Sequence, residues 1–351
     1  MTGPNPVLGR RGHGRRVGIG APSSIRDVAR IAGVSRQTVS RVINRHPNIS
    51  AGTESRVRAA MEQLAWRPNS MARALATSRT HSIGLLVSAR SHYGPFSAAG
   101  GVDDAARARG YTIVSATMAG SDETEIADAL DALVRQGVEA LVVIAPQERA
   151  HEALQRVAIG VPSITLQWRD GPEGRSVAFD QQAGARAATR YLIDLGHREI
   201  LHLAGPQDWS EAEDRMRGYL AEMSDRDLTP MPPVLGDWTA DTAFELGRRL
   251  LRFRDFSAVF SSNDQMALGF VHAAAEAGLR VPQDLSIVGF DDIPEAKHFT
   301  PPLTTVRQDF DELGRRAIGI LVAEIEGSAD TGYPMVTTPE LIVRASASRP
   351  A

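Results

Sequence analysis

The chain of 351 residues contains no cysteine. This absence excludes disulfide bonds, thiolate metal sites and a cysteine nucleophile, and it fits a reducing cytoplasm. Long apolar runs are also lacking, since none reaches the roughly 18 residues that span a bilayer. We therefore expect a cytoplasmic protein without a membrane partner.

Catalytic sequence motifs are missing as well. The chain has no HExxH, no GxSxG and no GxxxxGK[ST] pattern. Its nine histidines are scattered, and none forms a pair at helical spacing near acidic residues. We expect no enzyme activity, no cofactor and no metal site.

Lysine is absent from residues 1–80, but these residues carry 14 arginines against three acids, a net charge of +11. The remaining 25 basic and 39 acidic residues leave a net charge of −14 on the rest of the chain. A small basic segment on an acidic body is the electrostatic pattern of a DNA-binding head. Residues 1–22, with two arginine pairs among Gly and Pro, are predicted to be a disordered basic tail.

Residues 24–44 have the pattern of two short helices joined by a tight turn. Ser24 can cap the first helix with Asp27 three residues later, and Gly33 can end it in the left-handed conformation. Ser35 can cap a second helix, which is predicted to end near Asn44. A third helix is predicted over residues 53–65.

The second of these helices has a polar face beside an apolar one. Arg36, Gln37 and Arg41 would be exposed, whereas Val39 and Val42 would be buried. Such a helix reads the major groove in a helix-turn-helix protein. The sequence therefore predicts a DNA-binding transcription factor.

From residue 82 onward the pattern alternates between strands and helices. The predicted strands are 83–87, 111–116, 140–144, 163–166, 200–203, 258–260 and 285–289. The helices between them include 124–136, 184–195 and 265–277. This alternation predicts parallel sheets covered on both faces, and about 270 residues of it is too much for one open sheet. We expect two α/β lobes.

These features together resemble the lactose/galactose repressor family (LacI/GalR-type bacterial regulators). The similar segments follow the family order over roughly residues 24–345, so the probability of chance agreement is very small. They are residues 27–29, 32–35, 37–42, 66–69, 192–197, 203–206, 263–269, 281–292 and 302–308.

The resemblance implies two parts with different fold classes. The first is an N-terminal all-α helix-turn-helix headpiece, and the second is an α/β two-lobed, periplasmic-binding-protein-like (type I) effector core. The chain would cross three times between the lobes. The implied domains are a tail (1–22), a headpiece (23–68), a hinge helix and linker (69–80) and a core (81–346). The N-lobe would comprise about 81–179 and 309–338, and the C-lobe about 180–308 and 339–346.

The resemblance also implies which residues contact operator DNA. Arg36, Gln37 and Arg41 match the base-reading positions, where arginine can pair with guanine and glutamine with adenine. Contacts to phosphates would position the head without reading sequence. The candidates for these contacts are Ser24, Ser35, Thr38, Ser40 and Asn44.

A short hinge helix is implied just before the core. Leu75 matches the leucine that family members insert into a central base step of the minor groove, beside the basic Arg73. A helix of seven or eight residues is marginal alone, so it would form when two hinges pair on DNA. The alternative is that Leu75 is an ordinary residue of an amphipathic helix.

The effector cleft is implied at the carboxyl ends of the strands, between the lobes. The matching residues are Arg215, Asn263, Asp291 and Gln308, and Phe179 and Trp238 are the aromatic candidates beside them. Polar members of this set suit vicinal hydroxyls, which donate and accept, and the aromatic rings can stack on a sugar. Residues 236–239 resemble the galactoside-responsive members. The alternatives are that Trp238 is a core residue and Asp291 a turn residue.

Two features leave the sugar open. Gln167 and Trp168 stand where lactose-repressor-like members place an acidic sugar contact, and the cleft loop at 88–96 has a sequence of its own. Gly100 and Gly101 are also unusual inside the first core helix.

The predicted function is repression of carbohydrate-use genes, relieved when a small sugar effector releases the near-palindromic operator. Family members bind such sites as dimers, and residues 344–351 show no heptad repeat of a tetramer helix, so we expect a homodimer. The alternatives are a co-repressor-dependent regulator with a non-sugar ligand and a sugar-binding protein without a DNA role.

Overall fold

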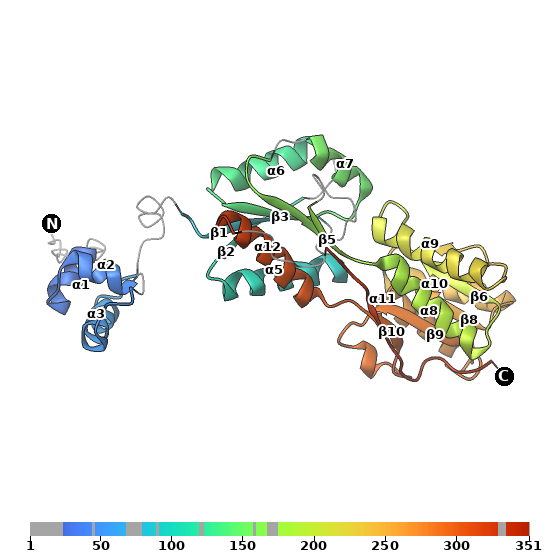
Figure 1. The fold of residues 1–351 in the computed structure, drawn as a ribbon. Coiled ribbons are helices and arrows are strands. Elements are labelled where there is room, and N and C mark those ends of the chain that lie inside the picture. Colours follow the sequence, from blue (N-terminus) through green and yellow to red (C-terminus); the bar gives the residue numbers. More distant parts are fainter. Residues whose placement is uncertain are drawn as a thin grey trace, which may run out of the picture. The chain divides into compact units, whose positions relative to one another are not determined.

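The computed structural model describes residues 24–43, 46–67, 79–88, 91–118, 123–156, 159–166, 175–328 and 335–350. The chain divides into two compact units, Met1–Arg79 and Thr80–Ala351 (Figure 1). Within the described ranges, no helix is long and apolar enough to cross a membrane.

The first unit contains three short helices, α1 (Ile25–Ala32), α2 (Arg36–Ile43) and α3 (Ala51–Gln63). The backbone N–H and the hydroxyl of Ser24 donate to Oδ2 of Asp27 at 3.0 and 2.8 Å, which fixes the start of α1. Gly33, at φ 66°, ends α1, because glycine tolerates the left-handed conformation that the turn requires. The predicted helix-turn-helix is confirmed.

The third helix differs from its prediction by one half-turn at each end. It begins at Ala51 rather than at residue 53, because Oγ of Ser50 accepts a hydrogen bond from the amide of Thr53 and caps it. It ends at Gln63, two residues before Ala65 adopts φ 46°. The buried side chains that hold the three helices together are Val28, Ala29, Ala32, Val39, Val42, Val57 and Ala60.

The second unit contains two six-stranded sheets, one in each lobe. The N-lobe consists of the sheet with the strand order β11-β5-β4-β3-β1-β2 and the helices that cover it. Its strands are all parallel: β1 (Ser82–Val87), β2 (Thr112–Thr117), β3 (Ala140–Ile144), β4 (Ser163–Leu166), β5 (Ser176–Phe179) and β11 (Val336–Thr337).

Helices cover both faces of the N-lobe sheet. On one face lie α5 (Tyr93–Ala108) and α12 (Phe310–Ile325), which pack on Leu85. On the other lie α6 (Glu123–Arg135) and α7 (Glu148–Arg156), which pack on Leu86 (Figure 1). Successive residues of a strand point to opposite faces, so continuous apolar strands are expected in such a sheet.

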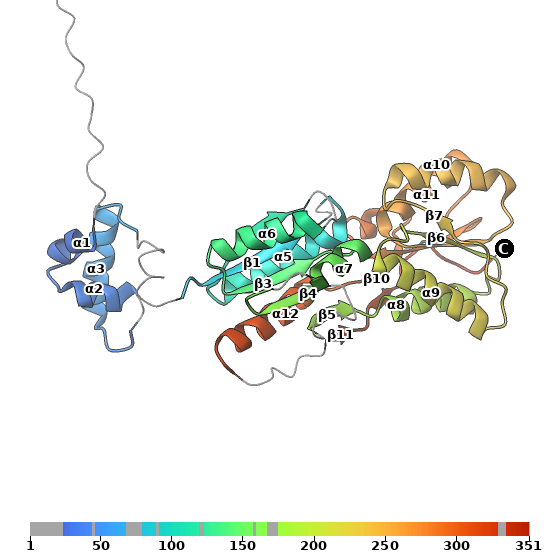
Figure 2. The ribbon, with the colours of Figure 1, turned by 90° about the horizontal axis from the view of Figure 1, so that it is seen from above.

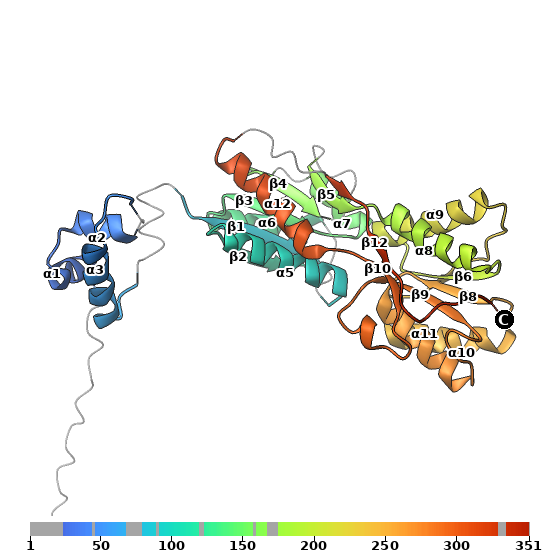
Figure 3. The same cartoon turned by 60° about the horizontal axis from the view of Figure 1, so that its bottom comes forward.

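The C-lobe is the sheet with strand order β12-β10-β9-β8-β6-β7 and its helices. Its strands are β6 (Ile200–Ala204), β7 (Val234–Leu235), β8 (Ala258–Ser261), β9 (Ser286–Asp291), β10 (Thr304–Arg307) and β12 (Glu340–Ile342), with β12 antiparallel. Helices α8 (Gln181–Leu195) and α9 (Ser210–Asp225) cover one face. Helices α10 (Ala240–Leu250) and α11 (Asp264–Glu276) cover the other (Figures 2 and 3).

Three segments connect the lobes. The chain passes from β5 to α8 at residue 180, from β10 to α12 at residues 308–309, and from β11 to β12 at residues 338–339 (Figure 3). The predicted two-lobed architecture with three crossings is confirmed. The sequence analysis did not predict five short strands, namely β5, β7, β10, β11 and β12. Runs of two to four residues carry little periodicity, although β4 and β8, also of four residues, were predicted.

The adjacent Gly100 and Gly101 of α5 have different structural roles. A Cβ on Gly101 would lie 2.3 Å from the carbonyl oxygen of Phe310 in α12, so only glycine allows these helices to approach so closely. Gly314 of α12 faces Gly101 in the same contact. Gly100, the next residue, has nothing within 4 Å of such a Cβ.

Candidate functional site

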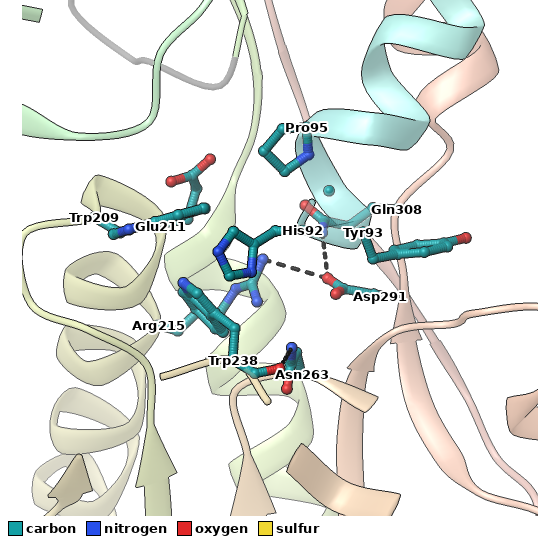
Figure 4. A pocket seen from close by; sticks show the side chains of 11 residues that line it. His92, Tyr93, Pro95, Trp209, Glu211, Arg215, Trp238, Asn263, Asp291 and Gln308 are labelled. Carbon is teal, nitrogen blue, oxygen red and sulfur yellow. Dashed lines mark hydrogen bonds and ion pairs between the residues drawn. The ribbon is translucent and has the colours of Figure 1, made fainter. Parts of the chain in front are cut away.

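A cleft of about 350 Å³, open to solvent, lies between the lobes (Figure 4). Open parallel sheets place ligands at the carboxyl ends of their strands. Five of the six predicted effector residues line it, namely Arg215, Trp238, Asn263, Asp291 and Gln308. Residues 92–95 of the expected cleft loop also line it, whereas Trp209 and Glu211 were not predicted.

Charged and amide groups meet at one end of the cleft. Nη2 of Arg215 lies 3.5 Å from Oδ1 of Asp291, and Nε2 of Gln308 donates to the same oxygen at 2.7 Å (Figure 4). Burial raises the pKa of Asp291 to about 6, while the Arg215 charge and the Gln308 hydrogen bond oppose that rise. Burial also lowers the pKa of Arg215, and the two opposite charges compensate each other inside the protein.

Gln181 extends this group, although the sequence did not single it out. Its Oε1 accepts a hydrogen bond from Nε of Arg215 at 2.9 Å, and its Nε2 donates to Oε1 of Gln308 at 2.7 Å. Gln181 begins α8 directly after the first crossing, whereas Gln308 lies in the second crossing. The network therefore joins the cleft to two of the segments that connect the lobes. We call Arg215, Asp291, Gln308 and Gln181 the cleft network.

Asn263 serves the fold and the cleft together. Its Oδ1 accepts from the amide of Met266 at 2.9 Å and caps α11, and its Nδ2 donates to the carbonyl of Trp238 at 3.0 Å. Trp238 has φ 72°, and its ring lies against Gly205, where a Cβ would be 2.3 Å away. The lining position of Trp238 is thus fixed by its neighbours.

The indole N–H of Trp238 is buried without a hydrogen-bond partner among the described residues. A buried donor without an acceptor costs free energy, so each such group needs an explanation. Trp238 lines the cleft, so a ligand with an acceptor oxygen is the missing partner that we consider for its N–H group.

Phe179 is not among the cleft residues. It is 2% exposed and packs in the N-lobe core, edge-on to Phe310 with ring centroids 5.6 Å apart. It ends β5, whose side chains are all buried. We therefore correct the expectation that Phe179 stacks on the effector: it is a core residue beside the first crossing.

The residues around Trp209 form a contact between the lobes. The amide of Glu148 in the N-lobe donates to the carbonyl of Asp208 at 3.0 Å, and the amide of Ser210 donates to the carbonyl of Pro146 at 3.2 Å. The ring of Trp209 stands edge-on to those of His92 and Trp238, with centroids 5.1 and 5.5 Å apart. Trp209 follows β6, so its place after a strand end was a usable signal.

In the first unit, Arg36, Gln37 and Arg41 lie exposed on α2, opposite the buried Val39 and Val42. None of the three side chains forms a hydrogen bond or an ion pair with any residue that the structure describes. Their side chains are placed as a base-reading face requires.

The hydroxyls predicted to contact phosphates have roles in the helix ends. Oγ of Ser35 accepts from the amide of Thr38 at 3.0 Å, and the hydroxyl of Ser24 donates to Asp27. Ser40 is half-buried. The predicted Asn44, Arg73 and Leu75, residues 1–22, the segment 69–78, and Gln167 and Trp168 lie outside the described residues.

The described part of the chain has no group of three or more His, Asp or Glu arranged to hold a metal ion.

Among buried acids outside the cleft, Asp264 accepts from Oγ1 of Thr305 at 2.6 Å and from the amide of Ile293 at 2.9 Å. Burial raises the pKa of Asp264 well above its usual value. These hydrogen bonds hold the loop that follows β9, the strand that ends at Asp291.

Two parts of the sequence match known family models. Residues 24–69 match the bacterial regulatory proteins of the lacI family, and residues 189–347 match a periplasmic binding protein-like domain. The ribose operon repressor of Escherichia coli K12 is 36% identical over 93% of this chain and 100% of that protein. The lactose operon repressor of the same strain is 33% identical over 90% and 88%.

A solved structure gives the same relationship. The crystal structure of the lac repressor dimer bound to operator and the anti-inducer ONPF has a TM-score of 0.83 and 32% identity to this chain. The match covers 93% of this chain and 100% of that one. The similarity therefore extends over both units.

Proposed function

The chain belongs to the lacI family of bacterial regulatory proteins, and we propose that it represses carbohydrate-use genes until a small sugar in its cleft releases it from operator DNA. Sequence-specific DNA binding and transcriptional regulation follow from the family. Our proposal concerns three further points: that the effector is a sugar, that it weakens operator binding, and which residues contact the sugar and the DNA.

The cleft network is the observation that carries the proposal. Arg215, Asp291 and Gln308 line the space that a ligand would enter, and Gln181 links two of them to the start of α8. A ligand that hydrogen-bonds to Asp291 or Gln308 competes with bonds that tie two crossings together. Ligand binding is thereby coupled to the angle between the lobes, which is a two-state element of the kind that switches require.

The chemistry of the lining favours a sugar. Vicinal hydroxyls both donate and accept, and the cleft offers two carboxylates, a guanidinium and two amides. Tyr93, Trp209 and Trp238 add flat apolar faces for the C–H faces of a sugar ring. The relatives named for the ribose and lactose operons support the same class of effector.

On the DNA side, we propose that Arg36, Gln37 and Arg41 read base edges in the major groove. Their exposure on α2 and the lacI-family match over residues 24–69 support this assignment. Contacts to phosphates by Ser24, Ser35, Thr38, Ser40 and Asn44, DNA binding by Arg73, and insertion of Leu75 into the minor groove remain predictions.

We propose that the active form is a homodimer that acts in the cytoplasm, where bacterial operator DNA lies. A near-palindromic operator requires two heads related by two-fold symmetry, and the similar lac repressor is a dimer on its operator. We assign the cleft a binding role and no catalytic step, because the relatives are repressors.

The experiment is a fluorescence anisotropy titration of the full chain with DNA from upstream of its own gene. D-Ribose, D-glucose, D-galactose and lactose are then added one at a time. We expect at least one of them to weaken operator binding, and Asp291→Ala to abolish that response while leaving operator affinity without sugar unchanged. A sugar that tightens binding would make it a co-repressor, and a chain that ignores every sugar would contradict the proposal.

A further inference from the structure

Glu211 is a cleft residue that the cleft network leaves unused. It lies in the first turn of α9, two residues after Trp209, and is 4% exposed. The backbone hydrogen bonds at Ser210 and Glu148 hold this turn against the N-lobe. In Figure 4 its carboxylate lies apart from that of Asp291, so the cleft presents acids at two separate places.

Burial of this carboxylate outweighs the groups that favour its charged form, namely its own backbone N–H, the Arg215 charge and Ser210. Among the described residues its one side-chain partner is Ser210, whose Oγ lies 3.4 Å from Oε2. No Arg, Lys or His of the described ranges forms an ion pair with it. Arg215, on the same helix, is already committed to Asp291, Gln181 and the carbonyl of Ser262. Burial accordingly raises the pKa of Glu211 to about 7.

The charges around the cleft do not balance. Asp291 is compensated by Arg215, and burial lowers the pKa of His92, which keeps that ring neutral. Glu211 therefore gives the lining an excess negative charge when it is ionised. An anionic ligand would be repelled, whereas a cation would compensate the buried carboxylate in a poorly solvated site.

A second unused group restricts the ligand further. The indole N–H of Trp238 is buried without an acceptor, as Glu211 is without a strong donor. One ligand that satisfies both must carry a donor, preferably charged, and an acceptor oxygen on a compact frame. A sugar ring bearing an ammonium group beside its hydroxyls has both.

We propose that the effector is an amino sugar and that Glu211 is the specificity-determining residue that binds its ammonium group. This inference rests on the proposed function, since it names the effector class of the same cleft. A neutral hydroxyl can also donate to this carboxylate, but an ammonium adds a direct attraction between opposite charges, which is strong in a poorly solvated site.

The test is calorimetry of the full chain at pH 7 with three matched pairs: D-glucosamine and D-glucose, D-galactosamine and D-galactose, D-mannosamine and D-mannose. We expect one amino sugar to bind roughly tenfold or more tightly than its neutral partner. In Glu211→Gln the difference should fall to within about twofold, because the amide keeps the shape and loses the charge.

Glu213→Gln is the matched control, because Glu213 lies on the same helix turn and pairs with Arg217 on the outer face. It should keep the wild-type preference, and both variants should keep wild-type operator affinity without sugar, which shows that they fold. Equal binding of both members of each pair, or a preference that survives Glu211→Gln, overturns the inference and leaves the sugar-responsive function standing. Failure of all six sugars to bind overturns the inference, and the proposed function then depends on the titrations with D-ribose and lactose.

Discussion

Gln181 and Gln308 are joined by a hydrogen bond of 2.7 Å, and each stands at a different crossing between the lobes. The same Gln181 accepts from Arg215, which lines the cleft. A ligand bound to Gln308 would thus contact one crossing directly, and the hydrogen bond to Gln181 would connect it to the other. The predictions below separate this coupling from the binding of sugar and of DNA.

Replacing Gln181 with alanine removes the link between the crossings but none of the groups that line the cleft. We expect sugar to bind within a few-fold of wild type, while its effect on operator affinity falls about fivefold, or roughly 1 kcal/mol of a coupling of 1–3 kcal/mol. Anisotropy titrations with and without sugar measure this. Gln182→Ala, one residue along α8 and half-buried, is the control and should keep full coupling. Unchanged coupling in Gln181→Ala would contradict a role for the network.

The exposed face of α2 should control operator recognition independently of sugar. Arg36→Ala is expected to cost about 1–3 kcal/mol of operator affinity and to relax preference at one base pair. Arg58→Ala removes the same charge from α3, where Arg58 pairs with Glu54 at 2.8 Å, and should cost much less. Competition with mutated operators measures both. Equal losses in the two variants would mean that charge alone, rather than base reading, explains the contribution of Arg36.

Glu211 should make the stability of the core pH-dependent. Its folded pKa is about 7, above the usual 4.5, so between those values the folded state holds more protons than the unfolded state. Stability from this group therefore falls as pH rises from about 4.5 to 7. Arg215 and Asp291 act on the same carboxyl, and they lower and raise its pKa respectively.

Glu211→Gln removes that penalty. We expect the variant to be more stable than wild type at pH 8, by up to about 3 kcal/mol, and to differ little at pH 4.5. Melting temperatures at the two pH values, without sugar, measure the effect. Glu213→Gln should show no such pH dependence. If both variants changed the melting temperature equally at the two pH values, the buried carboxylate of Glu211 would not be the cause.

The neighbouring glycines of α5 offer a matched pair for packing. Gly101→Ala places a Cβ against the backbone of Phe310, and we expect a loss of about 1–3 kcal/mol and a lower melting temperature. Gly100→Ala meets nothing and should stabilise the helix by about 0.5–1 kcal/mol. Equal melting temperatures would show that α5 and α12 can separate without cost.

The sequence predicted those parts of the molecule that local patterns determine. Gly33 and Ser35 fixed the turn of the head, and the apolar runs that became β1, β3 and β8 could be read as buried strands. Short strands such as β7 and β11 could not, because their pairing depends on tertiary contacts. The extension of α3 to Ala51 depended on a cap at Ser50 that the weak helix former Gly52 obscured.

The cleft shows the same division. Arg215, Asn263, Asp291, Gln308 and Trp238 were found through motif positions that the family shares. Gln181, Trp209 and Glu211 were not, because their roles come from which loops meet after the chain has crossed between lobes. Phe179 was misassigned because the sequence does not say whether an aromatic ring at a strand end faces the cleft or the core.

Reciprocity is the most direct test of the claim that the cleft controls DNA binding. Calorimetry would measure the affinity of one responsive sugar for the free protein and for the protein saturated with operator. The account predicts that operator weakens sugar binding by the same factor by which sugar weakens operator binding. Equal sugar affinity in the two states would contradict it.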